Sequence, residues 1–124
     1  MSIVKEIAFT AYPAKDVAAL RRWYQDVLEI PFSKPFLEDG VEKYVEANIA
    51  GGYFSLMTNE WVDRAPGSAS GIVFEVNDLD HLITTLRGKG VAVEDPYATP
   101  VCKITSFSDP EGNKVSLHQT TVPH

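Results

Sequence analysis

Residues 7–33, IAFTAYPAKDVAALRRWYQDVLEIPFS, and residues 71–91, GIVFEVNDLDHLITTLRGKGV, follow one pattern: a strand-like stretch, an aspartate and an amphipathic helix. Asp16 and Asp78 occupy the same place in the two copies, directly before an apolar stripe of helical period. Each copy continues into strand-like segments, which end in GGYFSLMT (51–58) and in DPEGNKVSLHQ (109–119). Such a repeat predicts two supersecondary units that bury their apolar faces against one another.

The boundaries of the expected elements follow from caps and breakers. Asp16 and Asp78 are expected to cap the two helices, Pro13 to end the first strand, and Pro31 to stop the first helix. Gly88 and Gly90 are expected to form the exit of the second helix. Residues 59–70 are polar and are expected to link the two copies. The strands are predicted at 3–12, 31–37, 41–49 and 53–58 in the first copy and at 71–76, 91–93, 101–108 and 114–119 in the second.

These elements predict an α+β domain with a mostly antiparallel or mixed sheet. The 124 residues, of which 44% are hydrophobic, are enough for one compact domain, 1–124, in which 1–60 and 68–121 are the two units. The net charge of −6 argues against nucleic acid as a partner, and the sequence has no apolar run long enough to span a membrane. A single cysteine, Cys102, and an N-terminus without signal-peptide character predict a cytoplasmic location.

The segments AKDVAALRRWYQDVLEI (14–30), FEVNDLDHLITTLRGKGV (74–91) and DPEGNKVSL (109–117) resemble the vicinal oxygen chelate superfamily. This superfamily includes glyoxalase I, bleomycin-resistance proteins, fosfomycin-resistance enzymes and extradiol dioxygenases. The resemblance covers nearly the whole chain and implies two βαβββ modules whose curled mixed sheets surround a cavity. It also implies a homodimer, with cavities shared between modules of different subunits. One departure is Glu29, which stands where the family usually has a glycine after the first helix.

The resemblance also tests whether this chain can hold a metal. Enzymes of the superfamily bind one divalent ion through four equivalent sheet positions, which fall here on Phe9, Ser55, Gly71 and Ser116. Phenylalanine, glycine and neutral serine are not the imidazole and carboxylate ligands that such ions take. We therefore expect neither a metal nor another cofactor.

Two ionisable residues of the second copy are candidates for acid and base. Glu75 and His118 are expected on the cavity face of their strands, where burial would raise the pKa of Glu75. They are candidate catalytic residues or, alternatively, ligands of a displaced metal site. The other alternative is that His118 is a polar residue lining the rim and Glu75 a surface residue at a strand end. Cys102 has no evident histidine partner in the sequence and is expected to be an inert thiol.

Aromatic side chains are the main candidates for binding a ligand, because their faces stack on flat or cationic molecules. The alternative is that they pack in the core or in a dimer interface. Trp61 lies in the linker and could act as a flap over the cavity. The expected ligand-binding residues are Phe9, Tyr44, Glu46, Tyr53, Ser55, Met57, Trp61, Val73, Glu75, Ser116 and His118.

The leading hypothesis is therefore a metal-independent protein that binds an organic ligand, cationic or aromatic, in a dimeric cavity. Its acidic charge would attract a cation over long range. The alternative is an enzyme, either a glyoxalase-like lyase or isomerase or a dioxygenase-type enzyme, with a divergent or displaced metal site. A third hypothesis is a structural module that dimerises without any ligand.

Overall fold

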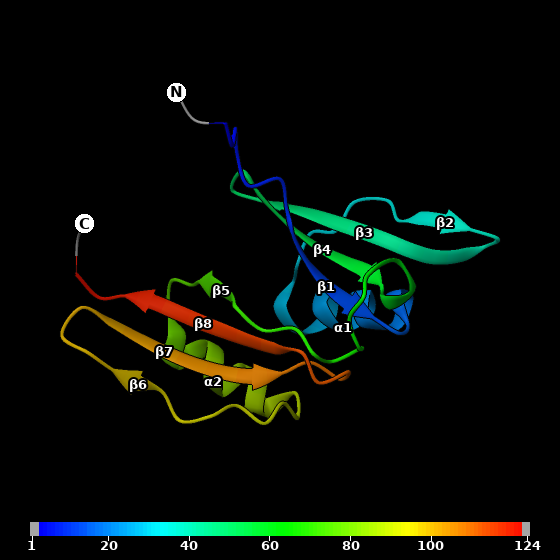
Figure 1. The fold of residues 1–124 in the computed structure, drawn as a ribbon. Helices are drawn as coiled ribbons and strands as arrows, with labels where there is room; N and C mark the ends of the chain where they lie inside the picture. The colour runs from blue at the N-terminus through cyan, green and yellow to red at the C-terminus, as the bar shows by residue number, and fades with distance from the viewer. Residues whose placement is uncertain (1–2, 123–124) are drawn as a thin grey trace.

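The computed structural model describes residues 3–122 (Figure 1). The first half contains β1 (Thr10–Ala14), α1 (Val17–Leu28), β2 (Phe36–Glu38), β3 (Val41–Ile49), β4 (Gly52–Thr58) and the short 3₁₀ helix η1 (Asn59–Trp61). The second half contains β5 (Ile72–Glu75), α2 (Leu79–Gly88), β6 (Tyr97–Ala98), β7 (Cys102–Ser108) and β8 (Lys114–Thr120). The order of one strand, one helix and three strands therefore occurs twice, as the sequence repeat predicts.

Each half forms its own four-stranded mixed sheet (Figure 1). The first sheet has the order β1-β4-β3-β2 and the second β5-β8-β7-β6. In both, the strand before the helix pairs in parallel with the last strand, and the other pairings are antiparallel. This is the expected α+β fold of two βαβββ modules, and neither sheet closes on itself.

The two helices begin as the sequence predicts. A carboxylate oxygen of Asp16 accepts a hydrogen bond from the amide of Ala19 at 3.0 Å, and Asp78 accepts one from the amide of His81 at 3.1 Å. These bonds satisfy donors that have no partner within the helix. At the end of α1, Glu29 adopts the left-handed conformation with φ of 56°, which explains why glycine is usual at this position. No helix within residues 3–122 is long and apolar enough to cross a membrane.

Three predicted strand boundaries were wrong. Strand β1 begins only at Thr10 and includes Pro13, which pairs with Met57. Proline is tolerated there because β1 is an edge strand. The strand predicted at 31–37 is reduced to one bridge, between Phe32 and Ala47, followed by β2. The strand predicted at 91–93 is absent, and β6 lies further along the chain.

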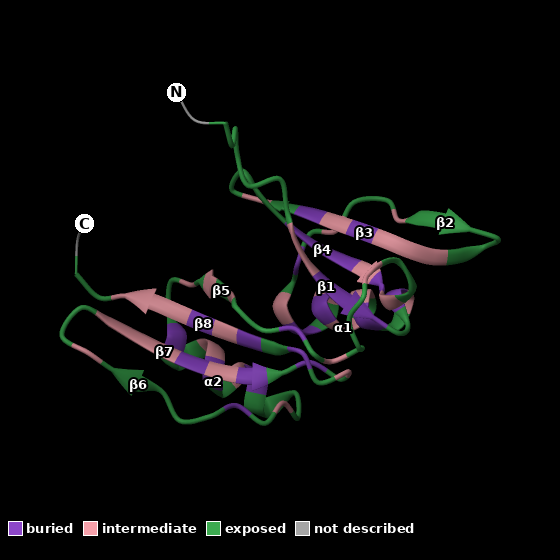
Figure 2. Cartoon of the chain, viewed as in Figure 1, coloured by how far each residue is buried: buried purple, intermediate pink, exposed green. Residues whose placement is uncertain are grey.

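The core lies where helices and sheets pack together (Figure 2). Helix α1 buries Leu20 and Tyr24 and packs on β3 and β4, whereas α2 packs on β8. Phe54 of the first sheet contacts Phe74 of the second with ring centroids 5.3 Å apart in edge-to-face geometry. The hydrophobic core is therefore continuous between the two halves. Its buried apolar side chains include Tyr12, Val17, Leu20, Tyr24, Val45, Phe54, Leu56, Leu79, Ile83, Leu86, Phe107, Val115 and Leu117.

The turn between β7 and β8 also joins the halves through a buried polar cluster. Asp109 accepts hydrogen bonds from the Tyr24 hydroxyl at 2.8 Å and the Asn113 side-chain amide at 2.9 Å. Burial, followed by the nearby Asp109 charge, raises the pKa of Tyr24, so this phenol stays protonated. The carboxylate of Glu111 accepts from the amides of Lys15 and Asp16 at 2.7 and 3.0 Å. The DPEGN segment, expected only as a turn, therefore fixes the second half against the first.

Candidate functional site

Each sheet has one face that packs against its helix and a second face that does not. We call the second the helix-free face, and in each sheet its residues follow from the strand register. On the first sheet it includes Pro13, Tyr44, Glu46, Ser55 and Met57, because these residues pair with one another across β1, β4 and β3. On the second sheet it includes Val73, Glu75, Cys102, Ile104, Ser106, Ser116, His118 and Tyr97, for the same reason.

Aromatic and polar side chains of the expected ligand set meet on the helix-free face of the first sheet. The rings of Phe9 and Tyr44 are 6.0 Å apart in edge-to-face geometry. The Tyr44 hydroxyl lies 2.8 Å from the hydroxyl of Ser55 and donates to a carboxylate oxygen of Glu46 at 3.3 Å. Burial raises the pKa of Tyr44, which keeps it protonated as a donor. Met57 is the register partner of Tyr44 on β4.

Two other aromatic residues of the set lie toward the ends of β4. Tyr53 is exposed near the start of this strand, where its hydroxyl accepts a hydrogen bond from the Asn48 side chain at 3.4 Å. Trp61 follows the strand in η1, and its ring lies 5.9 Å from that of Phe36 on β2. The flap role expected for Trp61 stays a prediction, but its side chain is exposed as that role requires.

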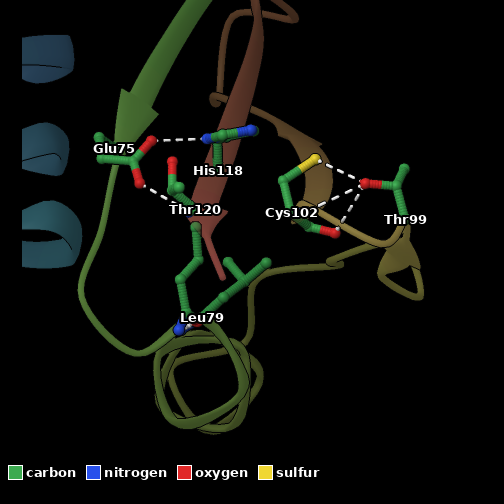
Figure 3. Close-up of polar contacts among 7 residues, drawn as sticks. Glu75, Leu79, Thr99, Cys102, His118 and Thr120 are labelled. Carbon is green, nitrogen blue, oxygen red and sulfur yellow. Dashed lines mark hydrogen bonds and ion pairs between the residues drawn. The ribbon is translucent and has the colours of Figure 1, made fainter. Parts of the chain in front are cut away.

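The second sheet carries an ion pair on its helix-free face. Oε1 of Glu75 lies 2.6 Å from Nδ1 of His118, its register partner on β8 (Figure 3). The other oxygen of Glu75 accepts a hydrogen bond from the backbone amide of Thr120 at 2.7 Å. Both side chains remain partly open to solvent, with 57% of Glu75 and 28% of His118 exposed. The structure therefore brings together the two residues that the sequence suggested as acid and base.

The pKa of Glu75 is shifted in the direction opposite to the expectation. The hydrogen bond from His118 and then the amide of Thr120 lower the pKa of Glu75, because both favour the ionised carboxylate. Burial, the reason for expecting a raised pKa, is a smaller effect because the side chain is exposed. Glu75 correspondingly raises the pKa of His118, with a smaller contribution from Cys102.

Cys102 is the functional candidate that the sequence reasoning missed. Its sulfur is 3.2 Å from the Thr99 hydroxyl, and the thiol is partly exposed. The hydrogen bond with Thr99 lowers the pKa of Cys102, and His118 lowers it further. No hydrogen bond joins Cys102 to His118 among the described residues, but the two residues lie on neighbouring strands, and the expectation of an inert thiol stays a prediction. Only the register of β7 with β8 reveals that His118 is near, since Cys102 lies opposite Thr120 and so diagonal to His118.

The four positions that hold the metal in related enzymes do not fit a divalent ion here. Ser55 is fully buried and bonded to Tyr44, and Ser116 shares a 2.9 Å hydrogen bond with Ser106. Phe9 has no donor atom, and Gly71 has no side chain. Within residues 3–122, no three histidine, cysteine, aspartate or glutamate side chains are arranged to hold a metal ion. No step of a reaction can be assigned to a metal at this place.

A further cavity lies between the two halves. This cleft has a volume of about 800 Å³, and apolar side chains from both sheets and from α2, such as Phe54, Phe74 and Leu82, form much of its wall. Tyr53, Val73 and Glu75 of the expected ligand set also line it. No local sequence pattern predicts this cleft, because it depends on how the two halves pack. The expected ligand residues thus fall into two groups, one on each sheet, and a few of them also line the cleft between the halves.

Comparison with known proteins extends these observations. The family model described as Glyoxalase/Bleomycin resistance protein/Dioxygenase superfamily matches residues 6–117. A search of curated proteins found no match.

Solved structures share the fold. The antibiotic binding protein TnmS3 from Streptomyces sp. CB03234 superposes with a TM-score of 0.84 and 22% identity, covering 98% of this chain and 100% of that chain. A glyoxalase/bleomycin resistance protein from the same organism gives 0.78 and 24% identity over 92% of this chain and 100% of that chain. Lactoylglutathione lyase from Agrobacterium tumefaciens gives 0.74 and 20% identity over 95% and 96%.

At these identities the solved structures establish the fold alone, and they include both a binding protein and an enzyme. The family model covers most of the chain, and its two βαβββ modules are both present. The chain therefore belongs to the Glyoxalase/Bleomycin resistance protein/Dioxygenase superfamily.

Proposed function

We propose that this protein binds an organic small molecule, without a metal, on the helix-free face of its first sheet. The observation that carries the proposal is the arrangement of Phe9, Tyr44, Ser55 and Glu46. Phe9 and Ser55 stand at two of the positions where related enzymes carry metal ligands, and here they contact the ring and the hydroxyl of Tyr44, which also donates to Glu46. A site of this kind has apolar surface for burial and polar groups for orientation.

The chemistry of the face favours a flat or cationic ligand. Aromatic rings bury large areas and attract cations through their faces. Glu46 is only partly buried, so its carboxylate can pair with a positive group of the ligand. The net charge of −6 adds a long-range attraction for cations. The printed description of TnmS3 as an antibiotic binding protein supports a small organic ligand, but it specifies no compound for this chain.

We further propose that a homodimer completes the site. Open sheets expose apolar side chains, which a second copy would cover by two-fold symmetry. Phe9, Tyr53 and Val73 are each at least 40% exposed. In such a dimer, the second sheet would supply Val73, Glu75, Ser116 and His118 as the opposite wall.

The test is ligand binding by calorimetry and thermal shift with two probes, metal-free bleomycin and the cationic dye acridine orange. At least one probe should raise the melting temperature of the wild type. Loss of the charge in Glu46→Gln and of the ring in Tyr44→Ala should each weaken binding about tenfold, because each removes one contact of about 1–1.5 kcal/mol. Glu94→Gln makes the same charge change on an exposed residue of the second half and should bind like the wild type.

Two results would contradict the proposal. One is equal binding by the wild type and both first-sheet variants, which would place the ligand elsewhere, for example in the cleft between the halves. The other is elemental analysis that finds one tightly held divalent ion per chain, lost on substitution of Ser55 or Ser116. Sedimentation analysis tests the dimer separately, since a chain of 13.7 kDa should sediment as a species of twice that mass.

A further inference from the structure

Cys102, His118 and Glu75 lie side by side on the helix-free face of the second sheet. They come from three neighbouring strands, β7, β8 and β5, so the sheet register fixes their relative positions. Figure 3 shows the His118 ring between Glu75 and Cys102, with one nitrogen toward each. Nδ1 is the nitrogen bonded to Glu75, at 2.6 Å. Nε2 therefore lies on the side of the ring that faces Cys102.

This order of groups is that of an activated nucleophile, its base and the residue that orients the base. When the Glu75 carboxylate accepts the proton on Nδ1, the neutral ring leaves Nε2 with a free lone pair. That lone pair can take the proton of the Cys102 thiol. Glu75 is itself held by the backbone amide of Thr120 at 2.7 Å, so the orientation of the imidazole does not depend on one flexible contact alone.

The surroundings of the sulfur also favour a thiolate. The hydroxyl of Thr99 lies 3.2 Å from Sγ and can donate to it. Together with His118, this hydrogen bond lowers the pKa of Cys102. The thiol is partly exposed, so a reagent can reach it, and thiols with a lowered pKa and access to solvent are the reactive ones.

We propose that Cys102 is a nucleophile that adds covalently to a soft carbon electrophile, an α,β-unsaturated carbonyl compound, with His118 as its base and Glu75 as the positioning residue. The proton of the thiol moves to Nε2, and the sulfur forms a bond to the β-carbon of the acceptor. The electron pair of the C=C bond moves toward the carbonyl as an enolate. The proton then passes from the imidazolium to the α-carbon. The net change is addition of S–H across C=C, and no oxidant or second substrate is needed.

The neighbours of the thiol fit this ligand class. Tyr97, Ile104 and His118 are consecutive register partners across β6, β7 and β8, so apolar surface lies beside the imidazole. Tyr97 is 68% exposed and available to a carbon skeleton. This step rests on the proposed function, because it uses the second-sheet wall of the proposed ligand site. It adds a covalent bond that the first-sheet contacts do not provide.

The experiment measures the rate at which methyl vinyl ketone adds to the protein, followed by intact-protein mass spectrometry across pH. Cys102 is the only cysteine in the chain, so one adduct reports one site. The wild-type rate should remain high below the ordinary thiol pKa of about 8.5. His118→Gln should move the rate profile to higher pH and slow addition about tenfold at pH values above the raised pKa of His118 and below about 8.5, where the imidazole is neutral, since the thiolate fraction falls. Glu75→Gln should shift the profile in the same direction by less.

His81→Gln removes a solvent-exposed histidine from α2 and should leave the profile unchanged. Cys102→Ser should form no adduct, and it should still bind a reversible first-sheet probe if the proposed function holds. The two proposals can therefore fail separately. A wild-type profile that coincides with that of His118→Gln, or with that of the urea-unfolded chain, would overturn the activated thiol.

Discussion

The helix-free faces of the two sheets have the same arrangement of strands but carry different side chains. In the first sheet, β1, β4 and β3 place Pro13, Met57 and Tyr44 side by side. At the equivalent register of the second sheet, β5, β8 and β7 place Glu75, His118 and Ile104. The first row is apolar and aromatic, whereas the second carries an ion pair. The same strand arrangement thus presents a surface for stacking in the first half and titratable groups in the second.

The helix-covered faces differ much less. Leu56 on β4 and Leu117 on β8 are equivalent, and both are almost fully buried. Buried positions must fill the space between helix and sheet, so their size and apolar character are constrained. Residues on the helix-free faces are free of that constraint. The comparison therefore separates the residues that build the fold from those that can differentiate its function.

The largest expected effect comes from disrupting the buried polar cluster around Asp109, which holds the two halves together. Asp109→Ala should lower the free energy of unfolding by at least about 4 kcal/mol, because it leaves Tyr24, Asn113 and two backbone amides without their acceptor. Urea unfolding followed by fluorescence measures this loss. Asp63→Ala removes an exposed carboxylate and should cost much less. Equal decreases in the free energy of unfolding of the two variants would show that the buried cluster does not stabilise the contact between the halves.

The equivalence of the two cores can be tested by paired truncation. Leu56→Ala and Leu117→Ala should each cost about 3 kcal/mol, since each removes a buried side chain of the same size. Because Phe54 and Phe74 join the cores, each variant should unfold in a single transition of the whole chain. Calorimetry and urea unfolding measure both quantities. Two separate transitions would mean that the halves are independent folding units.

The smallest expected effect is the pH dependence of stability that the Glu75–His118 ion pair gives to the second helix-free face but not to the first. The folded-state pKa of His118 is raised, so its stabilisation is complete below about pH 6.5 and is lost as pH rises through the raised value. The folded-state pKa of Glu75 is lowered, so its stabilisation is complete above about pH 4.3 and is lost as pH falls through the lowered value. The pair therefore stabilises the fold most between about pH 4.3 and 6.5.

The measurement is the melting temperature of the wild type and of His118→Gln at several pH values. Their difference should be largest inside this window and should shrink on both sides. Met57→Gln, at the equivalent position of the first sheet, should show no such dependence because no ion pair is present there. A difference that does not vary with pH would contradict the assigned ion pair.

Much of the fold could be predicted because local signals and long-range packing agree. The capping aspartates, the helical stripes and β3 at Val41–Ile49 are all found where the sequence indicates them. Pro13 was misleading, since a proline can stay within a strand at a sheet edge. The β2 and β6 strands are short edge segments with exposed side chains, so they leave no clear periodic pattern.

The candidate site was predictable only in part. Alternation within a strand placed Glu75 and His118 on one face, because the side-chain period of a strand is two. Alternation does not show that Glu75 and His118 touch, that Thr120 lowers the pKa of Glu75, or that Cys102 lies beside the imidazole. Those facts require the pairing of β5, β7 and β8. The cleft between the halves similarly requires the packing of both sheets.

By itself, the sequence determined the duplicated βαβββ pattern, the helix starts and the apolar faces, since caps and periodicity act over a few neighbouring residues. Tertiary structure alone decided that Asp109 joins the halves, that Ser55 and Ser116 are hydrogen-bonded within their own faces, and that Cys102 lies on the strand next to His118. Each of these arrangements brings together residues from different strands or helices. Hydrogen bonds and pKa values depend on distance in space, which strand register fixes and local sequence does not.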